Sequence, residues 1–194
     1  MSQKLPFIIY SESTPNPSVV KFVSNKLLSN NTKECLESGD AKGWPLLEKL
    51  FSFPFVKEIF INSNYISIKK HETLEWEEIT SQIRLFIQTE LNNNTVVCNT
   101  PILNKQEEKG KIRVKKNKIT LEIENVINEY IKPSIQMDGG DIELFSFNAG
   151  IVKVFLKGAC SGCPSSQMTL KDGIEVLLKE KFPNKIEEVI AINN

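Results

Sequence analysis

The chain has 194 residues, of which 40% are hydrophobic and 25% charged, so it holds one large or two small globular domains and is not disordered throughout. Lysine plus arginine equals aspartate plus glutamate at 24 each, which excludes a bulk field that would draw the whole molecule onto nucleic acid or an anionic membrane. No run of 18 or more apolar residues occurs, so we expect no membrane span.

The compartment is predicted from the first residues and from the cysteines. Residues 1–10 contain too short an apolar run for a signal peptide and no Arg-rich amphipathic leader. The four cysteines, Cys35, Cys98, Cys160 and Cys163, are too few and too unevenly spread for the disulfide framework of a secreted domain. We therefore expect a cytoplasmic protein, with a processed protein of the mitochondrial matrix as the alternative, whose thiols are free to bind metal.

Residues 1–94 predict a first domain that mixes strands and helices. Short runs rich in β-branched and aromatic residues, separated by turn-forming residues, predict two pairs of strands. These runs are residues 7–10, 19–23, 56–61 and 65–68. Pro45 begins a segment with helical spacing, which predicts a short helix, and the apolar residues from Trp76 to Leu91 predict a helix of about four turns.

Periodicity disappears between residues 95 and 117, where polar and charged residues predict an exposed linker. The pattern returns over residues 118–194, which predict a second domain. Its first helix should end shortly before Pro133, because the residue that precedes a proline disfavours helical dihedral angles.

The rest of this second domain predicts a hairpin, a helix and a strand. Alternating apolar residues flank a turn at residues 148–150, and Pro164 can occupy the first turn of a helix that ends before Pro183. Residues 186–192 predict the last strand. The predicted fold class is α+β, with two small α+β domains joined by a polar linker and the second arranged as helix, hairpin, helix and strand.

The chemically informative segment is a pair of cysteines, Cys160 and Cys163, separated by two residues. A turn over this spacing points both sulfurs the same way, so that the pair can bind one metal centre. Cys163 stands at the start of the following helix, where the positive end of the helix dipole favours thiolate, so we expect the pair to deprotonate readily.

One such pair supplies only half of the four thiolates that zinc sites and cubane clusters commonly take. The sequence has no second pair, its only histidine is His71, and Cys35 and Cys98 stand alone. A two-fold dimer would bring two copies of Cys160 and Cys163 together into a four-thiolate site. From the residues alone, three interpretations remain open: a shared cluster, a dimer with structural zinc, and a redox-active dithiol of a thiol-disulfide oxidoreductase.

Longer motifs around the cysteines resemble the NifU C-terminal domain family, the Nfu-type iron-sulfur scaffold and carrier proteins. The resemblance covers the chain from about residue 119 to its end, and the strings that carry it are residues 136–141, 158–166 and 169–175 together with Pro133. The first domain resembles the Nfu N-terminal domain more loosely, through residues 14–17, 21–22, 45–51 and 56–68 and through Trp76.

This resemblance implies a 4Fe-4S cluster that bridges two protomers through Cys160 and Cys163 of each, although four thiolates suit a 2Fe-2S centre equally well. It implies a homodimer when the cluster is bound, upstream cluster-assembly proteins as donors, and apo iron-sulfur proteins as acceptors. Transfer would proceed by stepwise thiolate exchange, which needs no acid-base machinery, so we do not expect an enzyme.

The remaining features predict ordinary structural roles. We expect His71 to be a surface residue and Cys35 and Cys98 to be plain thiols. The paired glycines within residues 138–141 are expected to permit positive φ angles rather than to contact the cysteine loop. The basic stretch 109–118 lacks interleaved aromatic residues, so we expect a solvated linker and no nucleic-acid binding.

Overall fold

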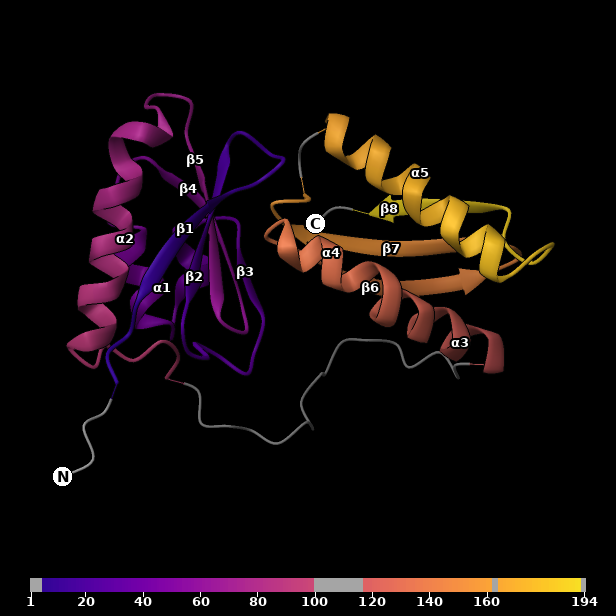
Figure 1. The fold of residues 1–194 in the computed structure, drawn as a ribbon, viewed down its shortest axis with the longest axis horizontal. Helices are drawn as coiled ribbons and strands as arrows, with labels where there is room; N and C mark the ends of the chain where they lie inside the picture. The colour runs from indigo at the N-terminus through magenta and orange to yellow at the C-terminus, as the bar shows by residue number, and fades with distance from the viewer. Residues whose placement is uncertain (1–4, 100–116, 162–163, 193–194) are drawn as a thin grey trace. The chain divides into compact units, whose positions relative to one another are not determined.

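The computed structural model describes residues 5–99, 117–161 and 164–192, the last range without the side chains of residues 164–169 (Figure 1). The chain divides into two compact units, Met1–Thr100 and Pro101–Asn194. Each unit combines helices with a sheet, so the predicted α+β class is correct. The predicted linker 95–117 and basic stretch 109–118 fall mostly outside the described residues, and their boundaries stay a prediction.

The first unit contains an antiparallel five-stranded sheet in the order β1-β2-β5-β4-β3. Both predicted pairs of strands are confirmed, because β1 pairs with β2 and β4 pairs with β5. Strand β3 was not predicted, since three residues are too few to show an alternating pattern. The strands are β1 Ile9–Ser13, β2 Val19–Ser24, β3 Lys33–Cys35, β4 Val56–Asn62 and β5 Tyr65–Lys70.

Two α-helices cover the core face of this sheet, α1 at Pro45–Leu50 and α2 at Trp76–Asn92, and a 3₁₀ turn spans Ser38–Ala41. Both predicted helices are confirmed. Helix α2 buries Trp76, Ile79, Ile83, Ile87 and Leu91, the apolar stripe that its sequence predicts. No helix in the described part of the chain is long and apolar enough to cross a membrane.

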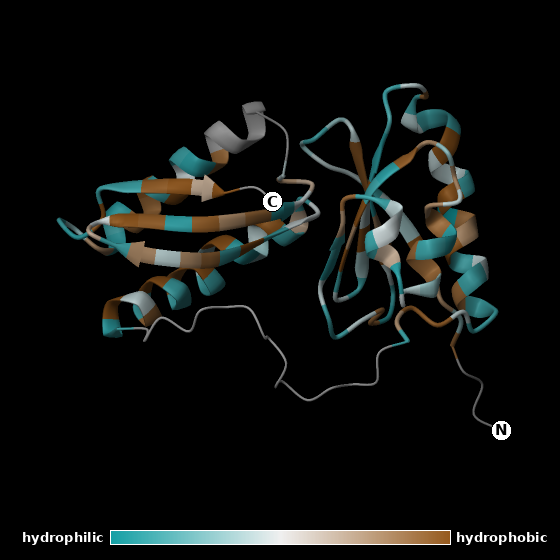
Figure 2. Ribbon diagram, turned by 180° about the vertical axis from the view of Figure 1, so that it is seen from behind, coloured by the Kyte–Doolittle hydropathy of each residue, from teal (hydrophilic) through white to brown (hydrophobic). Residues whose placement is uncertain are grey.

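The second unit has a three-stranded sheet in the order β6-β7-β8, in which β6 and β7 form an antiparallel hairpin and β8 runs parallel to β7. The predicted hairpin, the helix from Pro164 and the last strand are confirmed. Figures 1 and 2 show the helices of this unit on one side of its sheet. The elements are α3 Lys118–Val126, a π-helical segment Ile127–Ile131, α4 Lys132–Met137, β6 Gly140–Asn148, β7 Ile151–Gly158, α5 Pro164–Lys181 and β8 Glu188–Ile192.

The first helix of this unit does not end before Pro133, so that prediction is wrong. Lys132 keeps helical dihedral angles, with φ −55° and ψ −41°, and the helix continues to Met137. Pro133 stands in the first turn of α4, where a proline is tolerated because the N–H at this position would have no partner within α4. The π-helical segment directly before α4 changes the hydrogen-bonding register and lets the chain pass the proline without ending the helix.

Burial explains why this helix continues. Four isoleucines at four-residue spacing, Ile123, Ile127, Ile131 and Ile135, are each at most 6% exposed and face one core. In a straight α-helix, residues spaced by four drift around the axis by about 40° at each step. A π turn holds more residues than an α turn, so it absorbs the drift and keeps all four side chains in the core.

We predict that Ile135→Ala destabilises the second unit by about 2–5 kcal/mol, because it removes a fully buried side chain beyond Pro133. Both tryptophans, Trp44 and Trp76, belong to the first unit, so tryptophan fluorescence reports that unit alone. In denaturant unfolding, the midpoint of the second unit's transition, monitored by circular dichroism, should move to a lower denaturant concentration. The midpoint of the transition monitored by tryptophan fluorescence should not change. Leu121→Ala, at an exposed position of α3, is the control. Equal effects of the two substitutions would contradict the continuous helix.

Candidate functional site

Cys160 lies in the loop between β7 and α5, just after the hairpin ends at Gly158. The loop turns tightly because Gly158 takes a positive φ of 66° and its carbonyl oxygen accepts two hydrogen bonds from Ser161, at 3.0 Å from the backbone N–H and at 2.8 Å from Oγ. The turn directs the Cys160 side chain inward, where it is only 8% exposed.

The floor beneath Cys160 is the backbone of Gly139 and Gly140. A Cβ atom on Gly140 would lie 2.6 Å from Cys160 Sγ and 2.7 Å from the Lys157 carbonyl oxygen, closer than any real Cβ contact. Gly139 has a φ of 82°, and its carbonyl oxygen accepts a hydrogen bond of 3.2 Å from the Ala159 N–H. The positive φ that the sequence predicted for this glycine pair is confirmed at Gly139 only, and the expectation that the pair does not contact the cysteine loop is wrong, because Gly140 lies against Cys160.

The environment of Cys160 stabilises the neutral thiol. Burial, and to a lesser extent the nearby carboxylates of Asp138 and Asp141, together raise the pKa of Cys160 from 9.0 to about 12. The expectation that the pair deprotonates readily is therefore wrong for Cys160 in the metal-free chain, because burial and negative charge both oppose the thiolate. A bound cation reverses this balance, since a metal deprotonates the thiol that coordinates it.

The second predicted ligand, Cys163, lies outside the described residues. The other candidates from the sequence belong to the first unit: His71 is exposed, Cys98 is half-buried, and Cys35 is fully buried, which raises the pKa of its thiol to about 11. In the ranges that the structure describes, no three His, Cys, Asp or Glu side chains gather as a metal site.

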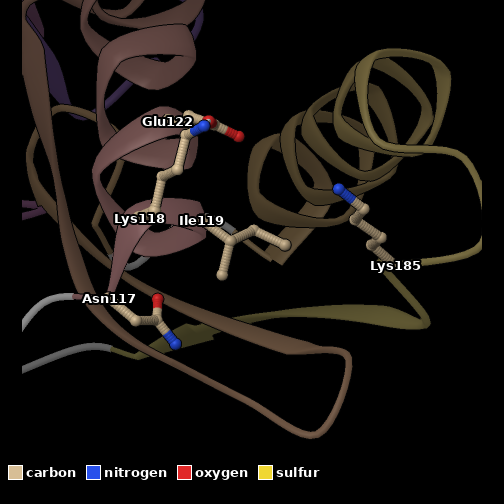
Figure 3. A pocket seen from close by; sticks show the side chains of 5 residues that line it. All are labelled: Asn117, Lys118, Ile119, Glu122 and Lys185. Carbon is tan, nitrogen blue, oxygen red and sulfur yellow. The ribbon is translucent and has the colours of Figure 1, made fainter.

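An open hollow of about 360 Å³ lies elsewhere in the second unit, at the start of α3 (Figure 3). It is lined by Asn117, Lys118, Ile119, Glu122 and Lys185, and it contains no residue of the cysteine loop. None of these lining residues is a cysteine, so the hollow offers no thiolate ligand.

Fold and site together define a two-domain α+β protein whose second domain carries a cysteine loop between a β-hairpin and a helix. The family model "Scaffold protein Nfu/NifU N terminal" matches residues 9–94, and the model "NifU-like domain" matches residues 123–190. A NifU-like protein of Schizosaccharomyces pombe, C1709.19c, is 33% identical over 193 residues, which cover 95% of this chain and 72% of that protein. The chain belongs to the Nfu family of NifU-like proteins.

A fly relative agrees with this assignment. The "NFU1 iron-sulfur cluster scaffold homolog, mitochondrial" of Drosophila sechellia is 31% identical over 185 residues, covering 93% of this chain. This chain spans 63% of the length of that fly protein. A solved structure of a NifU-like protein from Saccharomyces cerevisiae aligns with 52% of this chain and 92% of its own, at 21% identity and a TM-score of 0.44.

We predict that Gly140→Ala destabilises the second unit by about 1–3 kcal/mol, because the new methyl group overlaps Cys160 Sγ and a backbone carbonyl oxygen. It should also increase the rate at which iodoacetamide labels Cys160, measured by mass spectrometry of the peptide. The matched control is Gly173→Ala in α5, where an added Cβ meets nothing within 4 Å and should stabilise by about 0.5–1 kcal/mol. Unchanged labelling of Cys160 in Gly140→Ala would contradict the glycine floor.

The raised pKa of Cys160 predicts a pH dependence of stability. The folded state favours the protonated thiol, so this contribution to stability is complete below pH 9 and is lost as the pH rises toward 12. The unfolding free energy of the second unit, measured in metal-free wild type and Cys160→Ala, should therefore fall more steeply for wild type above pH 9. Lysine and tyrosine titrations are common to both proteins and cancel in the difference. Parallel curves would show that Cys160 titrates normally.

Proposed function

We propose that this protein is an iron-sulfur cluster scaffold and carrier that binds a cluster between two protomers through Cys160 and Cys163 of each. The observation that carries the proposal is the place of Cys160, a buried thiol held against a backbone floor, within residues 123–190 that match the NifU-like domain. The names of the fly relatives describe those proteins as iron-sulfur cluster scaffolds, which supports the same role here.

The dimer follows from the number of ligands. One copy of the pair offers two thiolates, whereas a 4Fe-4S cluster takes four, so a second copy of the chain completes the coordination. A 2Fe-2S centre would need the same four ligands, and we favour 4Fe-4S on the family resemblance. A cluster shared between two protomers can leave by stepwise exchange, in which a cysteine thiolate of the acceptor replaces one scaffold thiolate at iron.

The rival functions fit the site less well. A redox-active dithiol relies on a thiolate that is stabilised near neutral pH, whereas burial and two carboxylates hold Cys160 as a neutral thiol. Structural zinc would use the same half-site in a dimer, but the names of the fly relatives describe iron-sulfur cluster scaffolds, which favours the cluster. We propose a non-enzymatic carrier, because thiolate exchange requires no general acid or base.

Partners and location follow from this function. Upstream cluster-assembly proteins would load the dimer, and apo iron-sulfur proteins would receive the cluster. Of the two predicted compartments, cytoplasm and mitochondrial matrix, the matrix is favoured by the word mitochondrial in the names of the fly relatives.

The test is anaerobic reconstitution of the metal-free protein with iron and sulfide. We expect a brown product with a native mass near twice the 22.0 kDa of one chain and about four irons per dimer. Cys160→Ser and Cys163→Ser should each abolish the colour and the dimer, while the control Cys98→Ser should retain both. Brown monomers, a colourless dimer with stoichiometric zinc, or reduction of insulin by the protein would each contradict the proposal.

A further inference from the structure

Asp141 is a buried carboxylate that lies directly beyond the glycine floor of the cysteine loop. It is 2% exposed, although an ionised carboxylate is stable in a protein interior only when it is paired and hydrogen-bonded. Lys132 supplies the pairing charge, with Nζ 3.1 Å from Asp141 Oδ1, and Gln136 Nε2 donates a hydrogen bond of 3.3 Å to the same oxygen.

Both partners of Asp141 come from α4. Lys132 and Gln136 are four residues apart, so they share one face of the helix. Helix α4 lies beside the end of the sheet where β6 begins and β7 ends (Figure 1). The helix reaches this position only because it continues through Pro133, and the π-helical segment sets which of its faces meets β6.

The position of Asp141 is coupled to that of Cys160 through a short run of backbone. Asp141 follows Gly140, the residue whose Cα lies beneath Cys160 Sγ. In the hairpin, Asp141 is the register partner of Lys157 and Gly140 is that of Gly158, the residue that opens the cysteine loop. A shift of Asp141 toward solvent would therefore withdraw the floor from under the thiol.

We propose that Lys132, Asp141 and Gln136 form a positioning clamp that presses the Gly139–Gly140 backbone against Cys160 and thereby sets how firmly the cargo cluster is held. The second half of this statement rests on the proposed function. None of the three side chains has to touch the cluster. The clamp acts as the outer-shell partners of metal ligands do, whose loss weakens metal retention by about 10–100-fold.

Removing the positive charge should open the clamp. In Lys132→Met the buried carboxylate loses its counter-ion and is drawn toward water, so iodoacetamide should label Cys160 faster in the metal-free protein. In the reconstituted protein, loss of iron to a chelator should be about 10–100-fold faster than in wild type. Lys132→Arg should restore both properties, because a guanidinium also donates to a carboxylate.

The control is Lys171→Met, which removes a different lysine ion pair, with Glu188 at 3.4 Å, from the same unit. It should leave the labelling of Cys160 and the retention of iron unchanged. A double variant, Lys132→Met with Asp141→Asn, removes the orphaned charge and should bring the labelling of Cys160 back toward the wild-type rate.

Two results would overturn the clamp: equal labelling of Cys160 in Lys132→Met and Lys171→Met, or a Lys132→Arg variant as impaired as Lys132→Met. If Lys132→Met does not fold, the arginine variant and the double variant decide the question by the same labelling. Labelling is measured without metal, so it tests the clamp even if no protein binds a cluster. If no cluster binds, the proposed function is wrong, and the labelling of Cys160 in the metal-free protein still decides whether the clamp exists.

Discussion

The close contact between Cys160 and the backbone of Gly140 is the constraint on which the second unit depends. No side chain fits between them, since even a methyl group on Gly140 would overlap the sulfur and a carbonyl oxygen. The contact requires β6 to begin at one defined position beneath the end of β7, and the hairpin register provides that position by pairing Gly140 with Gly158. Hairpin, glycine pair and cysteine loop are therefore one unit of structure.

The continuous helix over residues 118–137, made of α3, the π-helical segment and α4, completes the arrangement. Four isoleucines anchor it to the core, and its π-helical segment adjusts the face that follows. On either side of Pro133 the same helix carries two partners of the Asp141 carboxylate, Lys132 just before the proline and Gln136 after it. Hydrophobic burial thus determines where the helix lies, and one buried ion pair determines how its end meets the strand below the cysteine.

Much of this fold could be predicted from the sequence, and the exceptions have physical reasons. Helix α2 and the β6–β7 hairpin were predictable because their apolar residues repeat over many positions. The preference of the residue before a proline failed at Lys132, because the burial of Ile131 and Ile135 outweighs a local steric preference. The cysteine pair was visible in the sequence, whereas the contact of Cys160 with Gly140 joins residues far apart in the chain and has no local signal.

The protonation state of Cys160 also depends on the three-dimensional fold and not on the local sequence alone. It bears on how a carrier would release its cargo. The sequence predicted that the helix dipole at the start of α5 favours the thiolate. Burial and the carboxylates of Asp138 and Asp141, which favour the thiol, arise from the three-dimensional fold. In the proposed carrier, iron makes the thiolate favourable and the surroundings of Cys160 make it unfavourable. The protein site therefore offsets part of the iron–sulfur bond energy when the thiol is regained on departure of the cluster. In the proposed carrier, a buried thiol that prefers its proton would favour release of the cluster to an acceptor thiolate.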